Sequence, residues 1–539
     1  MTEQPSEPAE QPEPGEPGSA PASLIRPQTL VHGIDWPNLF PFTRLFRAFG
    51  VAAQPSMLIL ALAAILTLYV FGQALDAAWY YVSDRVVPGE VELFHETAGG
   101  DNFEAALETK RESIRNHYEA YQRSVNAGNP EGVSLDAMRD ASIERRDNAI
   151  AAAERALDGV SDERRADAER LFDRRVQDAY ETTSQDWARL KQINGEGPFA
   201  TTLKWQTDAL NQLVGSLLRL DIDGAVAAIG RSLGTGPSWA VTRFPVYFAI
   251  FFAFKIAVLA VFGGALTRIA AVYVARDEKI SIREALKFSS GKFLSFVSAP
   301  LIPLLMLAGL GLAIALAGLL LNIPAIGPIA VGVGFILVLL GAMVMSLVVV
   351  GLVGGFNLMY PTIAVEGTDS FDAISRSFSY LYARPWTLAW YTLLSLLYGA
   401  VVYSVFRLFV WLTLSLSHGF IGLFSFRKLE GGREVIPAVW DEAPSFGKLS
   451  YDIDFIALSF PQDIAAFFIA FWVYLAIGLL GAFAMSLYFA SSTIIYFLMR
   501  KDVDATELDD VYMEEDIDDI FGTYDEEEQD AAPADTATA

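Results

Sequence analysis

One ionisable side chain lies near the middle of a long apolar segment, and no other position in the sequence points so directly to chemistry. The residue is Lys255, within the stretch YFAIFFAFKIAVLAVFGG. A charged side chain at the centre of a bilayer costs about 3 kcal/mol, so it usually faces water, a counter-charge or a transported substrate. Two hypotheses follow. Lys255 either lines a substrate or proton pathway, or it extends its long stem so that the ammonium group reaches the membrane surface.

The other residue types that usually carry chemistry form no pattern. The chain has no cysteine, and its four histidines (His32, His95, His117 and His418) lie far apart in sequence. Disulfides and thiolate metal sites are thereby excluded, and no metal-ligand spacing occurs. A Walker loop, a dinucleotide fingerprint, a nucleophile elbow and an H-E-x-x-H motif are also absent. We therefore predict no catalytic residue, no metal and no cofactor, and we expect no nucleic-acid partner.

Two short polar segments, each placed between apolar runs, repeat at an interval of 88 residues. The matched pairs are Ser281 with Asp369, Glu284 with Asp372, Ala285 with Ala373 and Ser289 with Ser377. In each copy a capping residue is followed three positions later by an acid, which satisfies free amide groups at the start of a helix. We predict that each segment is a short amphipathic helix, here called an elbow, which lies at the membrane interface between two spans. Docking of a cytoplasmic partner on the elbows is the alternative.

Six segments contain the roughly 20 apolar residues that a membrane span needs, so each could cross a bilayer. These segments must position Lys255 and the elbows. The segments are 57–78, 244–266, 294–321, 329–356, 386–410 and 465–497. Only NIPAIGP separates the third segment from the fourth, so these two should form an antiparallel hairpin. Gly351 and Gly355, in the fourth segment, have the spacing that lets another helix approach closely.

Basic residues flank the apolar segments asymmetrically. They occur before the first segment, between the second and third, between the fourth and fifth, and after the sixth; examples are Arg47, Arg276, Arg384 and Arg500. Because basic flanks stay on the cytoplasmic side, we predict that both termini are cytoplasmic. The expected location is a bacterial inner membrane, which the family resemblance described below implies. The formal net charge of −25 does not alter this prediction, because both chain ends are acidic and lack Lys and Arg.

The rest of the sequence divides into two tails and one large insertion. Residues 1–35 are rich in Pro and Glu, residues 501–539 are acidic, and both tails are predicted to be disordered. Residues 36–82 should hold an interfacial helix and the first span, and residues 244–500 the remaining bundle with both elbows. Residues 83–243 then form an extracytoplasmic helical domain. Apolar residues recur there at helical spacing in three stretches, which predicts a three-helix bundle or short coiled coil, with a dimerising coiled coil as the alternative.

The elbow pattern resembles that of uncharacterised bacterial multi-pass membrane proteins. The similarity covers roughly residues 245–410 and extends to the membrane domain that accompanies some glycerophosphodiester phosphodiesterases. Glu284 and Ala285 are also similar to the coupling loop of ATP-driven import permeases, although Leu286 replaces an alanine of that pattern and Gly291 falls one residue late. Neither resemblance supplies catalytic residues.

Together these observations predict an all-α fold: a six-span transmembrane bundle with interfacial elbow helices and an extracytoplasmic helical domain. The lipid bilayer is the expected environment, and a protein partner or a second copy of the chain is expected as well. We interpret the chain as a scaffold or assembly protein of a membrane complex. A transporter or permease component with Lys255 in its pathway is the alternative, and a membrane enzyme is the third hypothesis.

Overall fold

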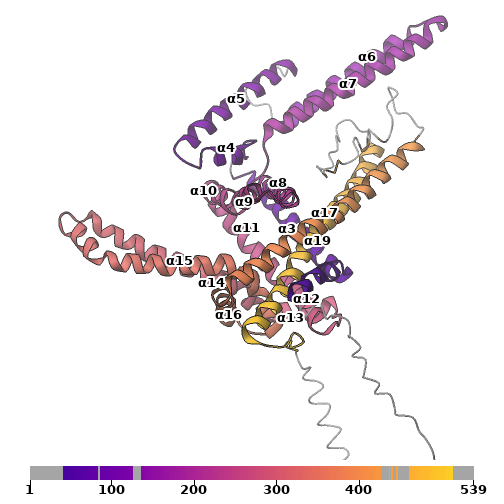
Figure 1. Ribbon diagram of the computed structural model, residues 1–539. Helices are drawn as coiled ribbons and strands as arrows, with labels where there is room; N and C mark the ends of the chain where they lie inside the picture. The colour runs from indigo at the N-terminus through magenta and orange to yellow at the C-terminus, as the bar shows by residue number, and fades with distance from the viewer. Residues whose placement is uncertain are drawn as a thin grey trace, which may run out of the picture. The chain divides into compact units, whose positions relative to one another are not determined.

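The computed structural model describes residues 40–82, 85–125, 135–425 and 460–513, with a few single positions between 436 and 449. Every regular element among these residues is helical, and their one β-type contact is an antiparallel bridge between Val86 and Glu196 (Figure 1). The all-α prediction is therefore confirmed. The tail predicted at 1–35, and the part of the second tail beyond residue 513, lie outside the described residues.

Six helices in the described part of the chain are long and apolar enough to cross a membrane. They are α3 (Pro55–Trp79), α11 continued by α12 (Pro245–Val258 and Gly264–Arg276), α14 (Phe293–Leu319), α15 (Ile326–Glu366), α17 (Pro385–Leu423) and α19 (Phe460–Asp504). A π-helical turn, Leu259–Gly263, joins α11 to α12. These six helices coincide with the six predicted segments, so the prediction of an integral, multi-pass membrane protein is confirmed at this level.

Several of the spanning helices are longer than a bilayer is thick. α15 has 41 residues and α19 has 45. At ~1.5 Å per residue they extend for about 60 Å or more, roughly twice the ~30 Å hydrocarbon core. The predicted segments ended earlier, at residues 356 and 497, where the uninterrupted apolar runs end. The helices continue beyond these points because other elements pack against their more polar ends, and those ends carry the candidate site.

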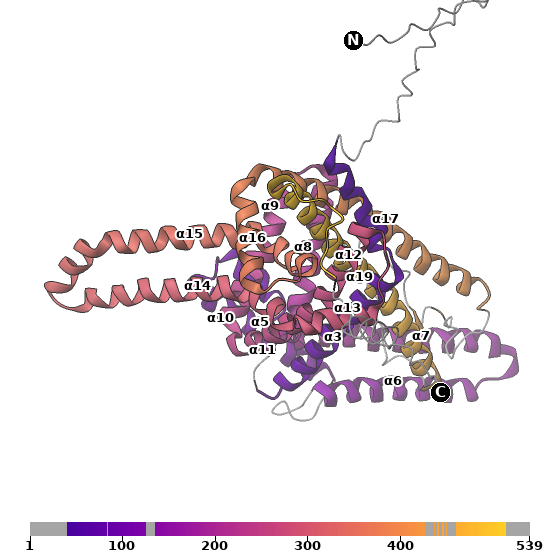
Figure 2. The ribbon, with the colours of Figure 1, turned by 90° about the horizontal axis from the view of Figure 1, so that it is seen from below.

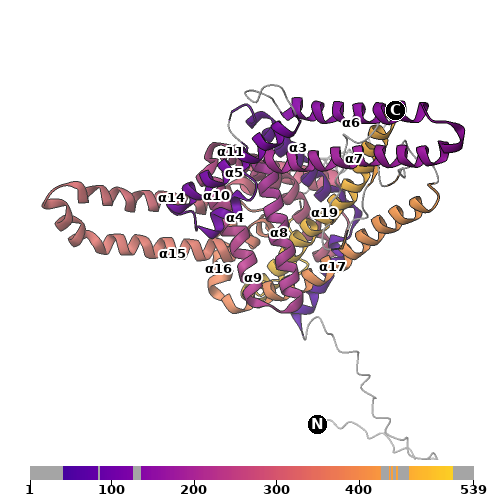
Figure 3. The same cartoon turned by 90° about the horizontal axis from the view of Figure 1, so that it is seen from above.

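The third and fourth spans form the hairpin predicted from their short connection. α14 and α15 lie side by side in all three views (Figures 1, 2 and 3). A 3-10 turn over Leu320–Asn322 ends the first helix, and Ala325, with a φ of +65°, precedes the second. The left-handed backbone at an alanine is unusual, and it reverses the chain within a few residues.

Both predicted elbows are helices in the structure. α13 (Ile282–Gly291) connects α12 to α14, and α16 (Ser370–Ala383) connects α15 to α17. A third, shorter elbow, consisting of a 3-10 helix (Pro41–Arg47) and α2 (Ala48–Ala52), precedes α3.

Glycines in α15 bring the second elbow directly against the helix that precedes it. A Cβ atom on Gly351 would lie 2.6 Å from the ring of Phe378, and one on Gly355 would lie 3.4 Å from the backbone of Ser377. Any side chain at these positions would separate the two helices. The glycines thus serve close helix packing, as predicted, but the helix that they admit is the elbow α16.

Seven α-helices lie between the first and second spans in the described part of the chain. They are α4 (Glu90–Glu96), α5 (Asn102–Val125), α6 (Leu135–Asp158), α7 (Arg165–Asn194), α8 (Pro198–Arg219), α9 (Ile222–Gly230) and α10 (Gly236–Arg243). The three amphipathic stretches in the sequence correspond to α5, α6 and α7. The sequence analysis did not anticipate α8, α9 and α10.

α6 and α7 pair along their length, as all three views show (Figures 1, 2 and 3). Arg145 and Asp186 form an ion pair between them, and Met138 and Leu190 are buried together. α5 is shared between two cores, because Phe103 packs in an aromatic cluster with α8 and α10 while Tyr118 reaches the α6–α7 pair. α6 and α7 therefore form a helical hairpin, and α5 contributes Tyr118 to its core.

The glycine contact leads to a stability prediction. Gly351→Leu should lower the free energy of unfolding by about 1–3 kcal/mol, because the new side chain would push the Phe378 ring away from α15. Gly309→Leu in α14 is the matched control, since a Cβ atom there meets no atom within 4 Å. Thermal unfolding in detergent would compare the two variants. Equal melting temperatures would contradict the close packing of α16 on α15.

Candidate functional site

Lys255 lies on an outward-facing side of α11. Its side chain is exposed in the protein, whereas Ile256 beside it is buried. Phe254, the residue before Lys255, stacks on Phe71 of α3 with ring centroids 3.7 Å apart. The structure therefore brings Lys255 to the helix surface and does not bring it together with the elbow residues. This position suits a side chain that extends along the helix toward the membrane surface.

The first elbow begins with a reciprocal cap. The backbone N–H of Glu284 donates to Ser281 Oγ at 3.2 Å, and the backbone N–H of Ser281 donates to the Glu284 carboxylate at 2.9 Å. These hydrogen bonds lower the pKa of Glu284. Because the folded-state pKa is lowered, the cap stabilises the helix at neutral pH and is lost as the pH falls through that lowered value. Ala285 and Ser289 are buried on the opposite side of α13.

The second elbow begins with a one-sided cap. Asp369 accepts a hydrogen bond from the backbone N–H of Asp372 at 3.0 Å. Ala373 and Ser377 are buried, and Ser377 Oγ donates to the Ala373 carbonyl at 2.6 Å. All eight predicted elbow residues therefore lie at helix starts or on buried helix faces, where they act on the local structure. Gly367, with a φ of +64°, ends α15 and allows the reversal into α16.

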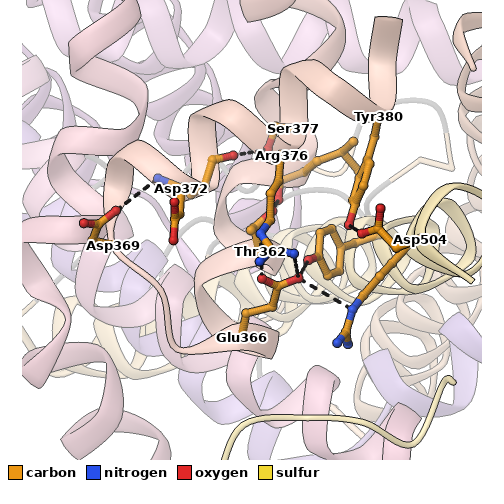
Figure 4. Close-up of polar contacts among 12 residues, drawn as sticks. Thr362, Glu366, Asp369, Asp372, Arg376, Ser377, Tyr380 and Asp504 are labelled. Carbon is orange, nitrogen blue, oxygen red and sulfur yellow. Dashed lines mark hydrogen bonds and ion pairs between the residues drawn. The ribbon is translucent and has the colours of Figure 1, made fainter. Parts of the chain in front are cut away.

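A buried carboxylate stands where the second elbow meets the last span. The side chains around this carboxylate form the Glu366 cluster, whose members are Glu366, Arg376, Tyr380, Tyr496, Arg500 and Asp504. Figure 4 labels Glu366, Arg376, Tyr380 and Asp504. The Glu366 side chain is only 8% exposed. Arg376 of α16 pairs with it at 2.9 Å, Arg500 of α19 lies 3.5 Å away, and the Tyr496 hydroxyl donates to it. Three helices thus converge on one carboxylate.

Tyr380 and Asp504 extend this cluster along the elbow. The Tyr380 hydroxyl donates a hydrogen bond to the Asp504 carboxylate, and Figure 4 shows the two side chains meeting across α16 and α19. Burial and the nearby Asp504 charge raise the pKa of Tyr380. The hydroxyl therefore keeps its proton at neutral pH and remains a donor. This contact fixes the last turn of α19 on the elbow.

The chain after α19 folds back onto the same junction. The Tyr512 N–H donates to the Val365 carbonyl at 2.7 Å, and Arg500 pairs with Asp510 at 2.6 Å. Buried Arg268 of α12 donates to the carbonyls of Ala364 at 2.8 Å and Tyr512 at 2.6 Å. Residues 505–513, predicted as part of a tail, therefore belong to the folded body. In the sequence, Arg500 indicates only the orientation of the sixth span.

The Glu366 cluster is suited to holding α15, α16 and α19 together as one unit. Its carboxylates are engaged by guanidinium and hydroxyl groups, and the described residues contain no group of three or more side chains that could hold a metal ion. Glu366 was missed in the sequence, although it is the only charged residue of the 41-residue α15. A lone acid at the end of an apolar helix is a signal that a basic partner lies nearby in the fold.

A second polar junction lies at the opposite ends of the first two spans. Asp76 of α3 accepts hydrogen bonds at 3.0 Å from the backbone N–H groups of both Phe199 and Ala200, the first residues of α8 after its proline. The Tyr247 hydroxyl of α11 donates to the same carboxylate at 2.5 Å. One acid thereby caps α8 and ties it to both spans.

No protein-family model matches the sequence, and neither the curated proteins nor the solved structures contain a match. The resemblances noted for the elbows therefore stay predictions.

The position of Lys255 generates a first prediction for the site. Lys255→Met should leave membrane abundance unchanged and should preserve or slightly raise the melting temperature, because it removes a charge whose transfer to the bilayer centre costs about 3 kcal/mol. Immunoblotting of membranes, thermal unfolding and growth complementation would check this expectation. Complete loss of complementation at normal abundance would instead place Lys255 in a transport pathway.

The Glu366 cluster generates a second prediction. Glu366→Ala should lower the free energy of unfolding by about 3–5 kcal/mol, because it removes the buried carboxylate that pairs with the buried Arg500 side chain and accepts from the Tyr496 hydroxyl. It should also expose residues 505–513 to proteases, since Arg500 would no longer be held beside α15. Glu278→Ala, at an exposed acid between α12 and α13, is the matched control. If both variants melt and digest alike, Glu366 does not organise this junction.

Proposed function

We propose that the protein is a membrane-embedded scaffold that holds other components of a membrane complex through the α6–α7 hairpin. The observation that carries this proposal is the pairing of these two helices mainly with each other. Among the other described helices, only α5 makes substantial contact with both of them. α7 has 30 residues, which corresponds to about 45 Å of helix whose outward sides are free to meet a partner.

The membrane body has the rigidity that a scaffold needs. The Glu366 cluster joins α15, α16 and α19 at one end, and Asp76 joins α3, α8 and α11 at the other. Each junction links elements that are far apart in sequence through charged hydrogen bonds, which are stronger than neutral ones. A hairpin carried on such a body would be presented in a defined position.

We further propose that the Glu366 end is cytoplasmic and that the hairpin lies outside, in a bacterial inner membrane. Contacts between Arg47 and Asp277, between Lys292 and Gly367, and between Arg268 and Tyr512 gather the basic flanks of the spans at one end. Basic flanks favour the cytoplasmic side. Asp76 and the helices that it caps then lie on the other side of the membrane.

Photo-crosslinking in native membranes tests the scaffold. A photoreactive amino acid at Leu171, a large apolar residue of α7 that is 55% exposed, should yield a discrete protein adduct that mass spectrometry can identify. The adduct would be either another membrane-complex component or a second copy of the chain. The control is the same amino acid at Leu294, which is 77% exposed on α14 and is expected to face lipid. Absence of any adduct from Leu171 and from other exposed hairpin positions would contradict the scaffold.

The alternative, a transporter or permease component, depends on Lys255. Because the Lys255 side chain lies on the helix surface, its position does not support the transporter hypothesis, and we rank the scaffold first.

A further inference from the structure

A row of exposed apolar side chains runs along α9 and the π-helical turn that follows it. The residues are Ile222, Val226, Ile229 and Leu233, which are spaced by four, three and four positions and therefore share one side of the helix. Three of them are 63–76% exposed, and Ile229 is 39% exposed. We call this row the α9 face. Exposure of such a row of large apolar side chains to water is unfavourable in free energy.

α9 is held firmly in this orientation by α8. Ala225 and Ala228, on a neighbouring side of α9, are buried. The side chain of Asp221 caps the helix by accepting from the Gly224 N–H at 3.0 Å. Trp205 Nε1 of α8 donates to the Arg231 carbonyl at 3.0 Å. Because its other sides are fixed by these contacts, α9 cannot simply turn its apolar face inward.

α8, which carries α9, is anchored near the ends of α3 and α11 and near the middle of α17. Asp76 caps α8 at the end of α3, and Tyr247 joins the same carboxylate two residues after α11 begins. Farther along α8, Asn211 accepts a hydrogen bond from Arg407 of α17 at 2.6 Å. These contacts place α8 and α9 at the level where the spans leave the bilayer.

Exposed apolar side chains also continue along the chain from the α9 face into the second span. Chain order leads from Leu233 through α10, where Val241 is 64% exposed, into α11, where Val246 is 61% exposed. Arg219, at the end of α8, is exposed and has the side chain that reaches phosphate groups from an interfacial helix. An apolar row beside a basic residue is typical of helices that lie in the membrane interface.

We propose that the α9 face is inserted into the outer boundary between headgroups and acyl chains of the same bilayer that the spans cross. α9 would then act as a membrane-lying anchor that fixes the depth of the domain carrying the α6–α7 hairpin. The occupant of the face is lipid, because α8 holds the face beside the ends of the first two spans, where the bilayer surface lies.

The absence of cysteine in the chain allows a direct test in the full-length protein. Val226→Cys and Ala227→Cys would each be labelled with an environment-sensitive fluorophore and reconstituted in vesicles that contain lipids brominated on their acyl chains. Both positions are exposed, but Ala227 points away from the α9 face. Label at position 226 should be quenched at least about twofold more than label at position 227, because only the former meets acyl chains.

Equal, weak quenching at the two positions would overturn the proposal, since it would place both labels in water. A label at position 226 that is immobilised but not quenched would also overturn it, because a protein partner or a second copy would then cover the face. Unchanged melting temperatures of the two unlabelled variants would confirm that both proteins are folded. A label at Ile229→Cys provides a second, independent reading of the same face.

Discussion

The carboxylate of Glu366, at the end of α15, is buried against the elbow that follows it and the distant last span, and it needs donors from both. Removing a carboxylate from water costs several kcal/mol unless cationic and hydrogen-bonding groups surround it. α16 supplies Arg376, and α19 supplies Arg500 and Tyr496. The elbow, the end of the fourth span and the end of the sixth span must therefore come together before this charge is compensated. The ion pair between Arg500 and Asp510 holds the chain that follows α19 at the same junction.

The two elbows show how a local repeat can lead to different packing. Both begin with a side chain that caps the third residue of the helix. Gly351, however, packs against Phe378 of its own elbow, whereas a Cβ atom on Gly263, 88 positions earlier, would lie 2.7 Å from the ring of Phe489 in α19. Capping depends on a few neighbouring residues, so it survives in both copies. Glycine contacts depend on which helix arrives from elsewhere in the chain, so they differ.

Polar junctions at both ends of the spans give the protein a framework, and the proposed roles follow from it. Asp76 couples the capped start of α8 to two spans, and α8 in turn holds α9. A domain fixed in this way can keep the α6–α7 hairpin at a constant height above lipid. The scaffold and the membrane anchor therefore depend on the same small set of hydrogen bonds.

The sequence alone determined the class of the protein, because bilayer thickness and the cost of exposed backbone leave few choices for six long apolar segments. It also determined the elbows, the hairpin of the third and fourth spans, and the caps at Ser281 and Asp369, all of which depend on neighbouring residues. Only the tertiary structure decided that Gly351 receives α16, that Glu366 gathers Arg376 and Arg500, and that Lys255 lies on a helix surface. Each of these outcomes depends on side chains that are distant in the chain, and hydropathy and spacing carry no information about which of them will meet.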